Sequence, residues 1–211
     1  MKRIVWIVAF MASVLGAQAQ HEVGTWTLTP KVGANLSKMS EQEVIYENFD
    51  SQAQMNAKYK FGLTAGAEAE YQAWQQVAVS AGVFYSGEGY TYGKVKDMDK
   101  LSQSLHFVSV PILLNFYIEP NLLPGLALKA GVQLGYLLSA KQHIGNVMTT
   151  VTDNYKRVNV SIPAGISYTY KAFTADFRYN IGVANLCNVD VIDRSWRTGS
   201  FWLTLGYQFV L

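Results

Sequence analysis

The stretch Ser200–Leu211, S-F-W-L-T-L-G-Y-Q-F-V-L, decides the fold of this chain. Side chains of an extended strand alternate between two faces with a period of two. One face of this stretch carries only large apolar residues: Phe201, Leu203, Leu205, Tyr207, Phe209 and Leu211. The other face carries Ser200, Trp202, Thr204, Gly206 and Gln208. An uninterrupted apolar face that ends in aromatic residues needs a solvent other than water, so we expect a strand that faces lipid.

Four residues of this stretch are similar to the terminal signal of bacterial outer-membrane barrels. That signal reads polar, x, Gly, x, x, aromatic, x, hydrophobic, and it is matched by Thr204, Gly206, Phe209 and Leu211. A soluble edge strand could match such a loose pattern by chance, but the position at the end of the sequence strengthens it. The stretch is therefore predicted to be the closing strand of a membrane β-barrel and a barrel-assembly signal.

The first residues have the pattern of a secretory signal peptide. Lys2 and Arg3 precede the apolar run Ile4–Leu15, and a small-residue Ala-x-Ala site ends at Ala19. The apolar run is shorter than the roughly 20 residues of a membrane-spanning helix. We expect residues 1–19 to be a cleaved signal peptide and residues 20–211 to be one outer-membrane β-barrel domain.

Charge and cysteine content exclude several other classes. Without Lys2 and Arg3, the 17 basic residues become 15 and equal the 15 acidic ones, so the basic isoelectric point is no argument for a nucleic-acid partner. The single cysteine, Cys187, cannot form an intramolecular disulfide. No metal-ligand cluster or cofactor motif is visible, so no cofactor is expected.

Eight segments alternate apolar and polar side chains with a period of two, which predicts an all-β, antiparallel up-and-down transmembrane barrel. These segments are residues 26–36, 58–71, 77–86, 105–118, 126–139, 157–170, 173–183 and 200–211. Pro111 lies inside the fourth segment and indicates a local bend. Lys171-Ala172 can only be a tight turn. Four longer polar stretches are expected to be loops: residues 37–57, 87–104, 140–156 and 184–199.

Two barrels fit this pattern, and they are inverses of one another. A lipocalin-like soluble barrel turns its apolar face inward, whereas an outer-membrane barrel turns that face toward lipid. The interior of an eight-stranded barrel is just wide enough for side chains, so the face with the glycines must be the inner one. The polar face carries nine glycines: Gly33, Gly62, Gly66, Gly82, Gly131, Gly135, Gly165, Gly182 and Gly206. The apolar face is therefore expected to point outward.

Loop lengths predict the orientation in the membrane. Long connections alternate with short ones, as extracellular loops and periplasmic turns do in outer-membrane barrels. Both termini are then expected in the periplasm of a Gram-negative cell. Six tyrosines near strand ends on the outward face are expected at the headgroup level: Tyr59, Tyr71, Tyr85, Tyr136, Tyr168 and Tyr207.

Residues 108–117 read V-S-V-P-I-L-L-N-F-Y, and residues 129–138 read K-A-G-V-Q-L-G-Y-L-L. These segments resemble the L-E-I-P-L-L-L-K-Y-Y and A-G-P-Q-x-G-Y-L-L strands of the PorT-like outer-membrane β-barrel proteins of the Bacteroidetes. Residues 175–186 resemble D-x-R-Y-x-x-G-L-x-N-I, and residues 30–37 resemble P-K-x-G-x-N-x-S. The strand-four glutamate of the family is Ser109 here, and the chain continues two residues past the usual terminal G-Y-x-F. The resemblance implies the fold and the membrane; one namesake is tied to protein secretion and gliding.

The inner face is expected to carry charges that must pair, because isolated charges are costly in a narrow, low-dielectric interior. The central set is Lys31, Glu68, Glu70, Lys129, Asp176 and Arg178, and Lys58, Lys60 and Arg157 are placed on the same face. An ion path or gate is one interpretation, and a structural network that plugs the barrel is the one we favour. Glu68 or Glu70 is expected to form a salt bridge with Lys129 or Arg178.

Catalysis has little support. A hydrolase would need a histidine ordered beside a serine or acid near the rim, and His106 with Ser102 or Ser104 is the one conceivable pair. Trp196, Arg194 and Arg197 in the last loop and Tyr90 and Tyr92 in the second suit contacts of the outer loops with glycans or protein partners, and they suit a lipid-headgroup girdle equally well.

The sequence therefore predicts a monomeric, non-enzymatic outer-membrane barrel that acts as a structural or interaction component in secretion or the envelope. The expected partners are outer-membrane lipid, the barrel-assembly machinery and envelope or secretion proteins, without nucleic acid. A narrow passive channel for small solutes is the alternative.

Overall fold

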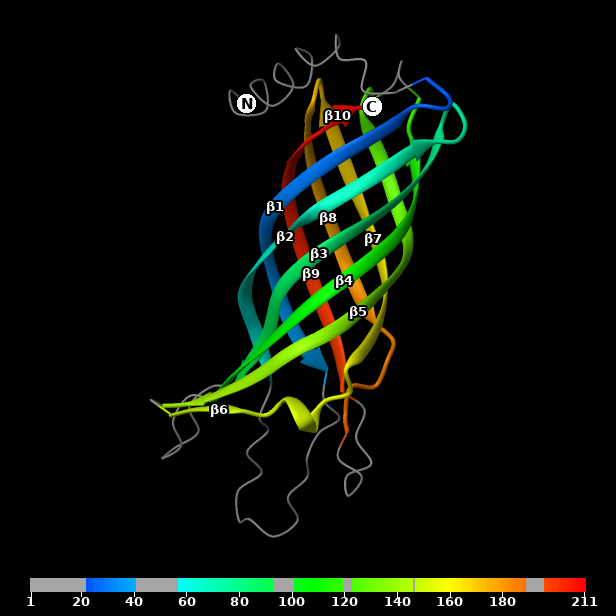
Figure 1. Cartoon of the computed structure of the whole chain (residues 1–211). Coiled ribbons are helices and arrows are strands. Elements are labelled where there is room, and N and C mark those ends of the chain that lie inside the picture. Colours follow the sequence, from blue (N-terminus) through cyan, green and yellow to red (C-terminus); the bar gives the residue numbers. More distant parts are fainter. Residues whose placement is uncertain (1–21, 41–56, 93–100, 120–122, 146, 189–195) are drawn as a thin grey trace, which may run out of the picture.

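The computed structural model describes residues 22–40, 57–92, 101–119, 123–145, 147–188 and 196–211 (Figure 1). No helix in these segments is long and apolar enough to cross a membrane. The strands are β1 (Trp26–Ser40), β2 (Ala57–Gln72), β3 (Val77–Tyr92), β4 (Leu101–Tyr117), β5 (Leu126–Ile144), β6 (Val147–Thr150), β7 (Val158–Tyr170), β8 (Phe173–Gly182), β9 (Arg197–Tyr207) and β10 (Phe209–Val210). A short 3-10 helix, η1, spans Thr152–Asn154.

Eight of these strands close into one barrel. The order β1-β2-β3-β4-β5-β7-β8-β9 follows the sequence, every neighbouring pair is antiparallel, and β1 also pairs with β9. Lys31 of β1 shows the closure, because it lies opposite Gly66 of β2 on one side and Gly206 of β9 on the other. The predicted eight-stranded up-and-down barrel is confirmed, and β6 only extends β5 as a hairpin.

Burial alternates along the strands, and the apolar face points outward as predicted. In β9, Trp202 and Thr204 are fully buried, whereas Leu203 is 56 % and Leu205 is 63 % exposed. The inner side chains are buried in the lumen, and the outer ones expose large apolar residues on each of the eight barrel strands. Soluble monomers rarely expose so large an apolar patch. The soluble, lipocalin-like alternative is therefore wrong.

The barrel has two unlike ends. One end, here called the terminal rim, carries Trp26, the C-terminus and the short connections Ala73–Gln76 and Lys171-Ala172. Lys171 has φ 55, which suits the tight turn expected at this position. The other end, here called the loop rim, carries Ser40, Tyr92 and Ile144 and the connections that join β1 to β2, β3 to β4, β5 to β7 and β8 to β9. The signal peptide predicted for residues 1–19 lies outside the described residues.

Several strands extend further toward the loop rim than the sequence predicted. Residues 37–40, 87–92, 101–104, 140–144 and 147–150 were expected in loops but are strands. The reason is that the polarity of the two faces inverts there. Inward-facing Tyr90 and Leu105 are buried, whereas their outward-facing neighbours Thr91 and Ser104 are polar. A pattern of apolar residues on the outer face predicts only the parts of the strands that contact lipid, and these segments extend beyond them.

Three irregularities interrupt the strands: one beside Pro111 in β4, one where β4 pairs with β5, and one in the closing strand. Beside Pro111, the pairing of β3 with β4 is interrupted between Ala81↔Ile112 and Phe84↔Ser109 but keeps its register. A β-bulge lies instead in β5, where Leu138 is the extra residue between the pairs His106↔Ser139 and Phe107↔Leu137. The closing strand begins at Arg197, earlier than expected, and is broken at Gln208, after which β10 pairs with β1.

Glycine on the inner face allows backbones and long side chains to approach closely. A Cβ on Gly66 would lie 2.6 Å from Cδ1 and 2.7 Å from Cα of Phe84. Real Cβ atoms do not make such contacts, and an interior this crowded cannot relax without cost. The inner position of Gly66 is therefore a packing requirement.

We predict that Gly66→Val lowers the free energy of unfolding by about 1–3 kcal/mol or prevents folding, because it overpacks the lumen. Urea unfolding in detergent micelles, followed by heat-modifiable gel migration, measures this change. Ala67→Val is the matched control, since Ala67 is the next residue and faces outward. Equal stability of the two variants would contradict the assignment of the inner face.

Candidate functional site

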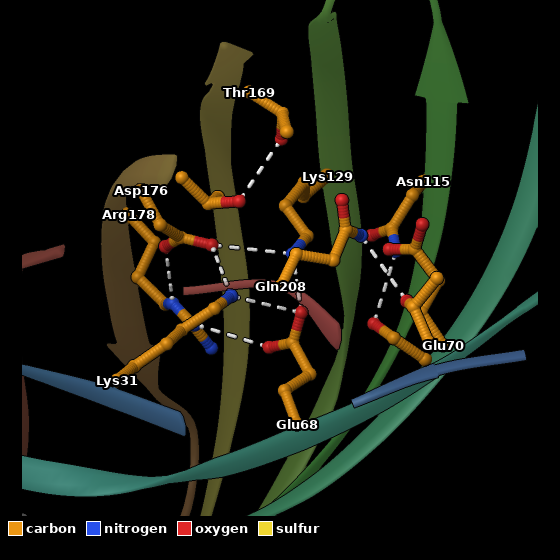
Figure 2. A network of polar contacts seen from close by, with 12 residues as sticks. Lys31, Glu68, Glu70, Asn115, Lys129, Thr169, Asp176, Arg178 and Gln208 are labelled. Atoms are coloured by element: carbon orange, nitrogen blue, oxygen red, sulfur yellow. Dashed lines mark hydrogen bonds and ion pairs between the residues drawn. The ribbon is translucent and has the colours of Figure 1, made fainter. Parts of the chain in front are cut away.

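Five charged side chains meet inside the barrel, each three to five residues from the terminal-rim end of its strand (Figure 2). Lys31 Nζ lies 3.0 Å from Glu68 Oε1 and 3.1 Å from Asp176 Oδ2. Lys129 Nζ pairs with the same two oxygens, at 3.2 Å for Asp176. Arg178 donates from Nε to Asp176 Oδ1 at 2.9 Å and from Nη2 to Glu68 Oε2 at 3.3 Å. Each of the three cations thus contacts both carboxylates, and we call these five residues the lumen cluster.

The lumen cluster is closed to solvent. None of its five residues is more than 6 % exposed. The side chains come from β1, β2, β5 and β8, so the ion pairs connect strands from all around the barrel (Figure 2). Such charges are tolerated in a low-dielectric interior only when they neutralise each other and their hydrogen bonds are made. Every charge of the cluster contacts charges of opposite sign, although three cations share two carboxylates, and Arg178 Nη1 has no hydrogen-bond partner.

Glycines make room for the cluster. Gly66 and Gly206 lie on either side of Lys31, and Gly165 lies between Lys129 and Arg178 in the strand register. A Cβ on Gly165 would come within 2.6 Å of Arg178 Cα, and one on Gly206 within 2.8 Å of Lys31 Cγ. Long charged side chains can therefore cross the lumen because their neighbours across the sheet have no side chain.

An aromatic layer covers the cluster on the side of the loop rim. The Arg178 guanidinium lies 5.3 Å from the ring centre of Phe84 and 5.7 Å from that of Trp202, both fully buried. These are cation–π distances. Above them, buried Glu88 accepts hydrogen bonds from Ser200 Oγ and from Trp202 Nε1, each at 3.3 Å. Sequence reasoning placed Glu88 in a loop and so missed it.

A second polar group lies toward the terminal rim. Glu70 accepts hydrogen bonds from Asn115 Nδ2 and from the Tyr117 hydroxyl, and Asn115 also donates to Ser80 Oγ at 3.0 Å. Glu70 is in no ion pair within the described residues, whereas Glu68 pairs with both Lys129 and Arg178. The expectation that one of these carboxylates bridges a lumen cation is thus confirmed for Glu68.

The loop rim of the lumen is filled by apolar side chains. Tyr155, from the segment after η1, turns inward, donates to Gln103 Oε1 at 2.8 Å and lies 2.9 Å from the Tyr90 hydroxyl. It belongs to a buried group of Met39, Tyr90, Tyr92, Leu105, Phe107, Leu137, Ala140, Tyr155 and Leu186. Because Tyr90 and Tyr92 are buried here, the expectation that they serve as exposed contact residues is wrong.

The remaining predicted residues lie elsewhere. Lys58 is exposed, and so is Arg157, whose Nη2 lies 3.9 Å from Asp153 Oδ1. The expectation that these two residues face the lumen is therefore wrong. Both lie where the alternation of the strand breaks near the loop rim. Lys60 is half-buried and donates to the Gln103 carbonyl and to Ser104 Oγ. His106 bonds through Nδ1 to the Tyr85 hydroxyl at 2.7 Å, not to Ser102 or Ser104.

The residues of the predicted assembly signal lie along the closing strand. Thr204 is fully buried opposite Asp176, and Gly206 lies beside Lys31. Phe209 and Leu211 are exposed on the outer surface.

The residues suggested for loop contacts lie in different places. Trp196 lies against Tyr155 with ring centres 5.3 Å apart, Arg197 is exposed, and Arg194 lies outside the described residues.

A closed antiparallel barrel with an apolar outer surface and a charged, filled lumen defines the class of small outer-membrane β-barrels. The family model described as "Outer membrane protein beta-barrel domain" matches residues 17–188. The chain belongs to this family and is an outer-membrane protein of the Gram-negative type. A comparison with curated proteins gave no significant match.

Solved structures agree with this fold. Neisserial surface protein A (NspA) is 14 % identical, with 87 % of this chain and 97 % of that chain covered and a TM-score of 0.51. OprG of Pseudomonas aeruginosa is 10 % identical, with 90 % and 98 % covered and a TM-score of 0.51. Ail, the attachment invasion locus protein of Yersinia pestis, is 17 % identical over 89 % of this chain and 100 % of that chain, with a TM-score of 0.47. At such identities the likeness to NspA and OprG shows the fold alone.

We predict that Glu68→Gln lowers the free energy of unfolding by about 3–5 kcal/mol, because three buried cations would then face a single cluster carboxylate. Urea unfolding in detergent micelles measures the change. Adding Lys129→Met to this variant should recover part of the loss, since it removes one of the unpaired cations. Glu119→Gln, on an exposed turn, is the control and should leave stability unchanged. Wild-type stability of Glu68→Gln would show that the cluster does not hold the strands together.

Proposed function

We propose that this protein is a monomeric, non-conducting and non-enzymatic component of the outer membrane that acts through its loops or turns on envelope or secretion partners. The observation that carries the proposal is the filled lumen. A protein whose interior is closed can act only at its lipid-facing surface and at its two rims. No cofactor takes part in this role.

Three successive layers support a closed lumen. Along the axis from the terminal rim lie the Glu70 group, the lumen cluster with its aromatic cover, and the apolar group around Tyr155. A water-filled path would expose the side chains along it, yet Lys31, Trp202 and Leu137 are each no more than 2 % exposed. An eight-stranded barrel has little free bore even before such layers are added. This argues against the alternative, a narrow passive channel.

The PorT-like assignment is part of the same proposal. The strand motifs that resemble that group contain three of the five cluster residues, Lys31, Asp176 and Arg178, and Lys129 directly precedes another of these motifs. The position of the group's strand-four glutamate is buried Ser109, and here the cluster takes its carboxylates from Glu68 and Asp176. The resemblance therefore includes residues that fill and neutralise the lumen. It supports a role in secretion or the envelope like that of the namesake.

We further propose that the loop rim faces outward and that both termini lie in the periplasm. Connections at the terminal rim are as short as Lys171-Ala172, whereas the connection between β1 and β2 at the loop rim spans residues 41–56. Outer-membrane barrels place short turns in the periplasm. In this orientation Thr204, Gly206, Phe209 and Leu211 lie at the periplasmic side, where the barrel-assembly machinery would read them.

Single-channel recording in a planar bilayer tests the closed lumen. We expect refolded wild-type protein to give no discrete current steps, because no continuous water path crosses its three layers. Heat-modifiable gel migration confirms beforehand that the inserted protein is folded, and a porin inserted in the same way shows that the bilayer reports conductance.

A widened variant sharpens the test. Phe84→Ala with Trp202→Ala removes the aromatic cover while keeping every ion pair of the cluster, and it should also remain silent if the cluster itself closes the lumen. Reproducible steps from the wild-type protein would contradict the proposal and favour the channel.

A further inference from the structure

The hairpin of β5 and β6 carries the barrel sheet past the loop rim and ends it in an open edge. The end of β5 pairs with β4 on one side, at Leu101↔Ile144, and with β6 on the other, at Ile144↔Val147. Within the described residues, β6 has no second strand partner. Figure 1 shows the hairpin projecting sideways from the end of the barrel. We call the side of β6 (Val147–Thr150) that faces away from β5 the β6 edge.

The β6 edge presents backbone groups that β5 does not use. Val151 N donates to Ala140 O at 2.9 Å, so these two residues form a hydrogen-bonded pair. Hydrogen-bonded and non-hydrogen-bonded pairs alternate along an antiparallel ladder. The next pair toward the turn, Lys141↔Thr150, is therefore non-hydrogen-bonded, and so is the pair that contains Met148. Met148 and Thr150 thus direct their N–H and C=O groups away from β5, and neither has another hydrogen bond within the described segments.

Lipid contact does not explain the side chains of the hairpin. Val147 is 65 % and Met148 is 58 % exposed, and Ile144 across the hairpin is 47 % exposed. The outward-facing residues at this height in β4 and β5 are polar or charged, such as Ser102 and Lys141, so the hairpin lies beyond the apolar belt. Apolar side chains in water beside an unpaired strand edge favour pairing with another polypeptide.

The β6 edge lacks most of the features that protect exposed strand edges. Natural edges are blunted by lysine or an inward-pointing charge, by proline, or by a β-bulge. The sequence of β6, V-M-T-T, contains no charge and no proline, and its four pairs with β5 run without a register shift. Valine and threonine also suit an extended pairing. Short length is the one protection that remains, and it limits a partner to few hydrogen bonds and to weak, reversible binding.

We propose that the β6 edge binds an extended, uncharged segment of a partner protein, which adds to the barrel sheet as a further strand. The donors and acceptors of Met148 and Thr150 repeat at the spacing of a strand. Another extended backbone matches this repeat, whereas a lipid or a glycan does not.

The proposal rests on the proposed function, because it names the surface with which the loop rim contacts a partner. It requires neither a closed lumen nor a particular orientation in the membrane. Current steps in a bilayer would overturn the closed lumen and leave binding at the β6 edge unaffected. Absence of peptide binding would leave the bilayer result unchanged, so the two failures can be told apart.

Amide hydrogen exchange of the refolded full-length barrel in detergent micelles tests the proposal. The probe is the peptide Thr-Val-Thr-Val-Thr-Val, acetylated and amidated at its ends, because it is extended and uncharged. At saturating peptide, the amides of Met148 and Thr150 should exchange at least about tenfold more slowly, since they then donate to the peptide. The amides of Val147 and Thr149 already donate to β5 and should change little.

A matched pair of variants separates the backbone from the side chain. Met148→Pro removes an outward N–H and keeps the pairing of β6 with β5, because proline is tolerated where an edge strand faces solvent. Met148→Thr removes the same apolar side chain but keeps this N–H. By fluorescence anisotropy of labelled peptide, affinity should fall about fivefold in Met148→Pro and stay within about twofold of the wild type in Met148→Thr.

Every other outcome overturns the proposal. Failure of the wild-type barrel to bind the peptide would show that the edge does not accept a strand, and equal losses in the two variants would show contact through side chains. Protection of other amides without Met148 and Thr150 would place the peptide elsewhere. Dimerisation of the peptide-free barrel, measured by sedimentation and abolished in Met148→Pro, would assign the edge to a second copy. If Met148→Pro does not fold, Thr150→Pro and Thr150→Val replace the pair, and the same difference in affinity is required.

Discussion

The structure depends on one constraint: the interior of an eight-stranded barrel is too narrow for water and too apolar in its surroundings for an unpaired charge. Three cations and two carboxylates satisfy it together, because each of Lys31, Lys129 and Arg178 contacts both Glu68 and Asp176. Removing either carboxylate leaves three buried cations with a single partner of opposite charge. The cluster therefore acts as a unit, and its strands are held in one register by it as well as by the backbone hydrogen bonds.

The same constraint explains the distribution of glycine. A long charged side chain can cross the lumen only where the strands beside it carry no side chain, and Gly66, Gly165 and Gly206 occupy those positions. Along each strand the outer residues must meanwhile remain apolar for the lipid. Both faces of the sheet are thus strongly specified, which leaves little freedom for a slipped register.

Much of this could be predicted from the sequence, because lipid contact imposes a strict period of two with an apolar outer face. The strands across the apolar belt, the inner position of the glycines and the pairing of Glu68 followed from that pattern. It failed near the loop rim, where the strands leave the lipid and Tyr90 and Leu105 turn inward. Glu88 was missed for the same reason, and Lys58 and Arg157 were wrongly assigned to the lumen. Which cation contacts which carboxylate depends on the register and the shear of the closed barrel. Neither quantity can be predicted from the residue pattern of a single strand.

Thiol accessibility tests the central claim, a lumen sealed around its charges, most directly. Ser167 is a buried lumen residue that lies opposite Asp176, and Met148 is 58 % exposed in β6. In a Cys187→Ser background, a small charged methanethiosulfonate reagent should not label Ser167→Cys in the folded barrel, whereas it should label Met148→Cys at once and both variants after unfolding in urea. Labelling of Ser167→Cys in the folded protein as fast as Met148→Cys would mean that water reaches the cluster, and the account of a closed barrel would be wrong.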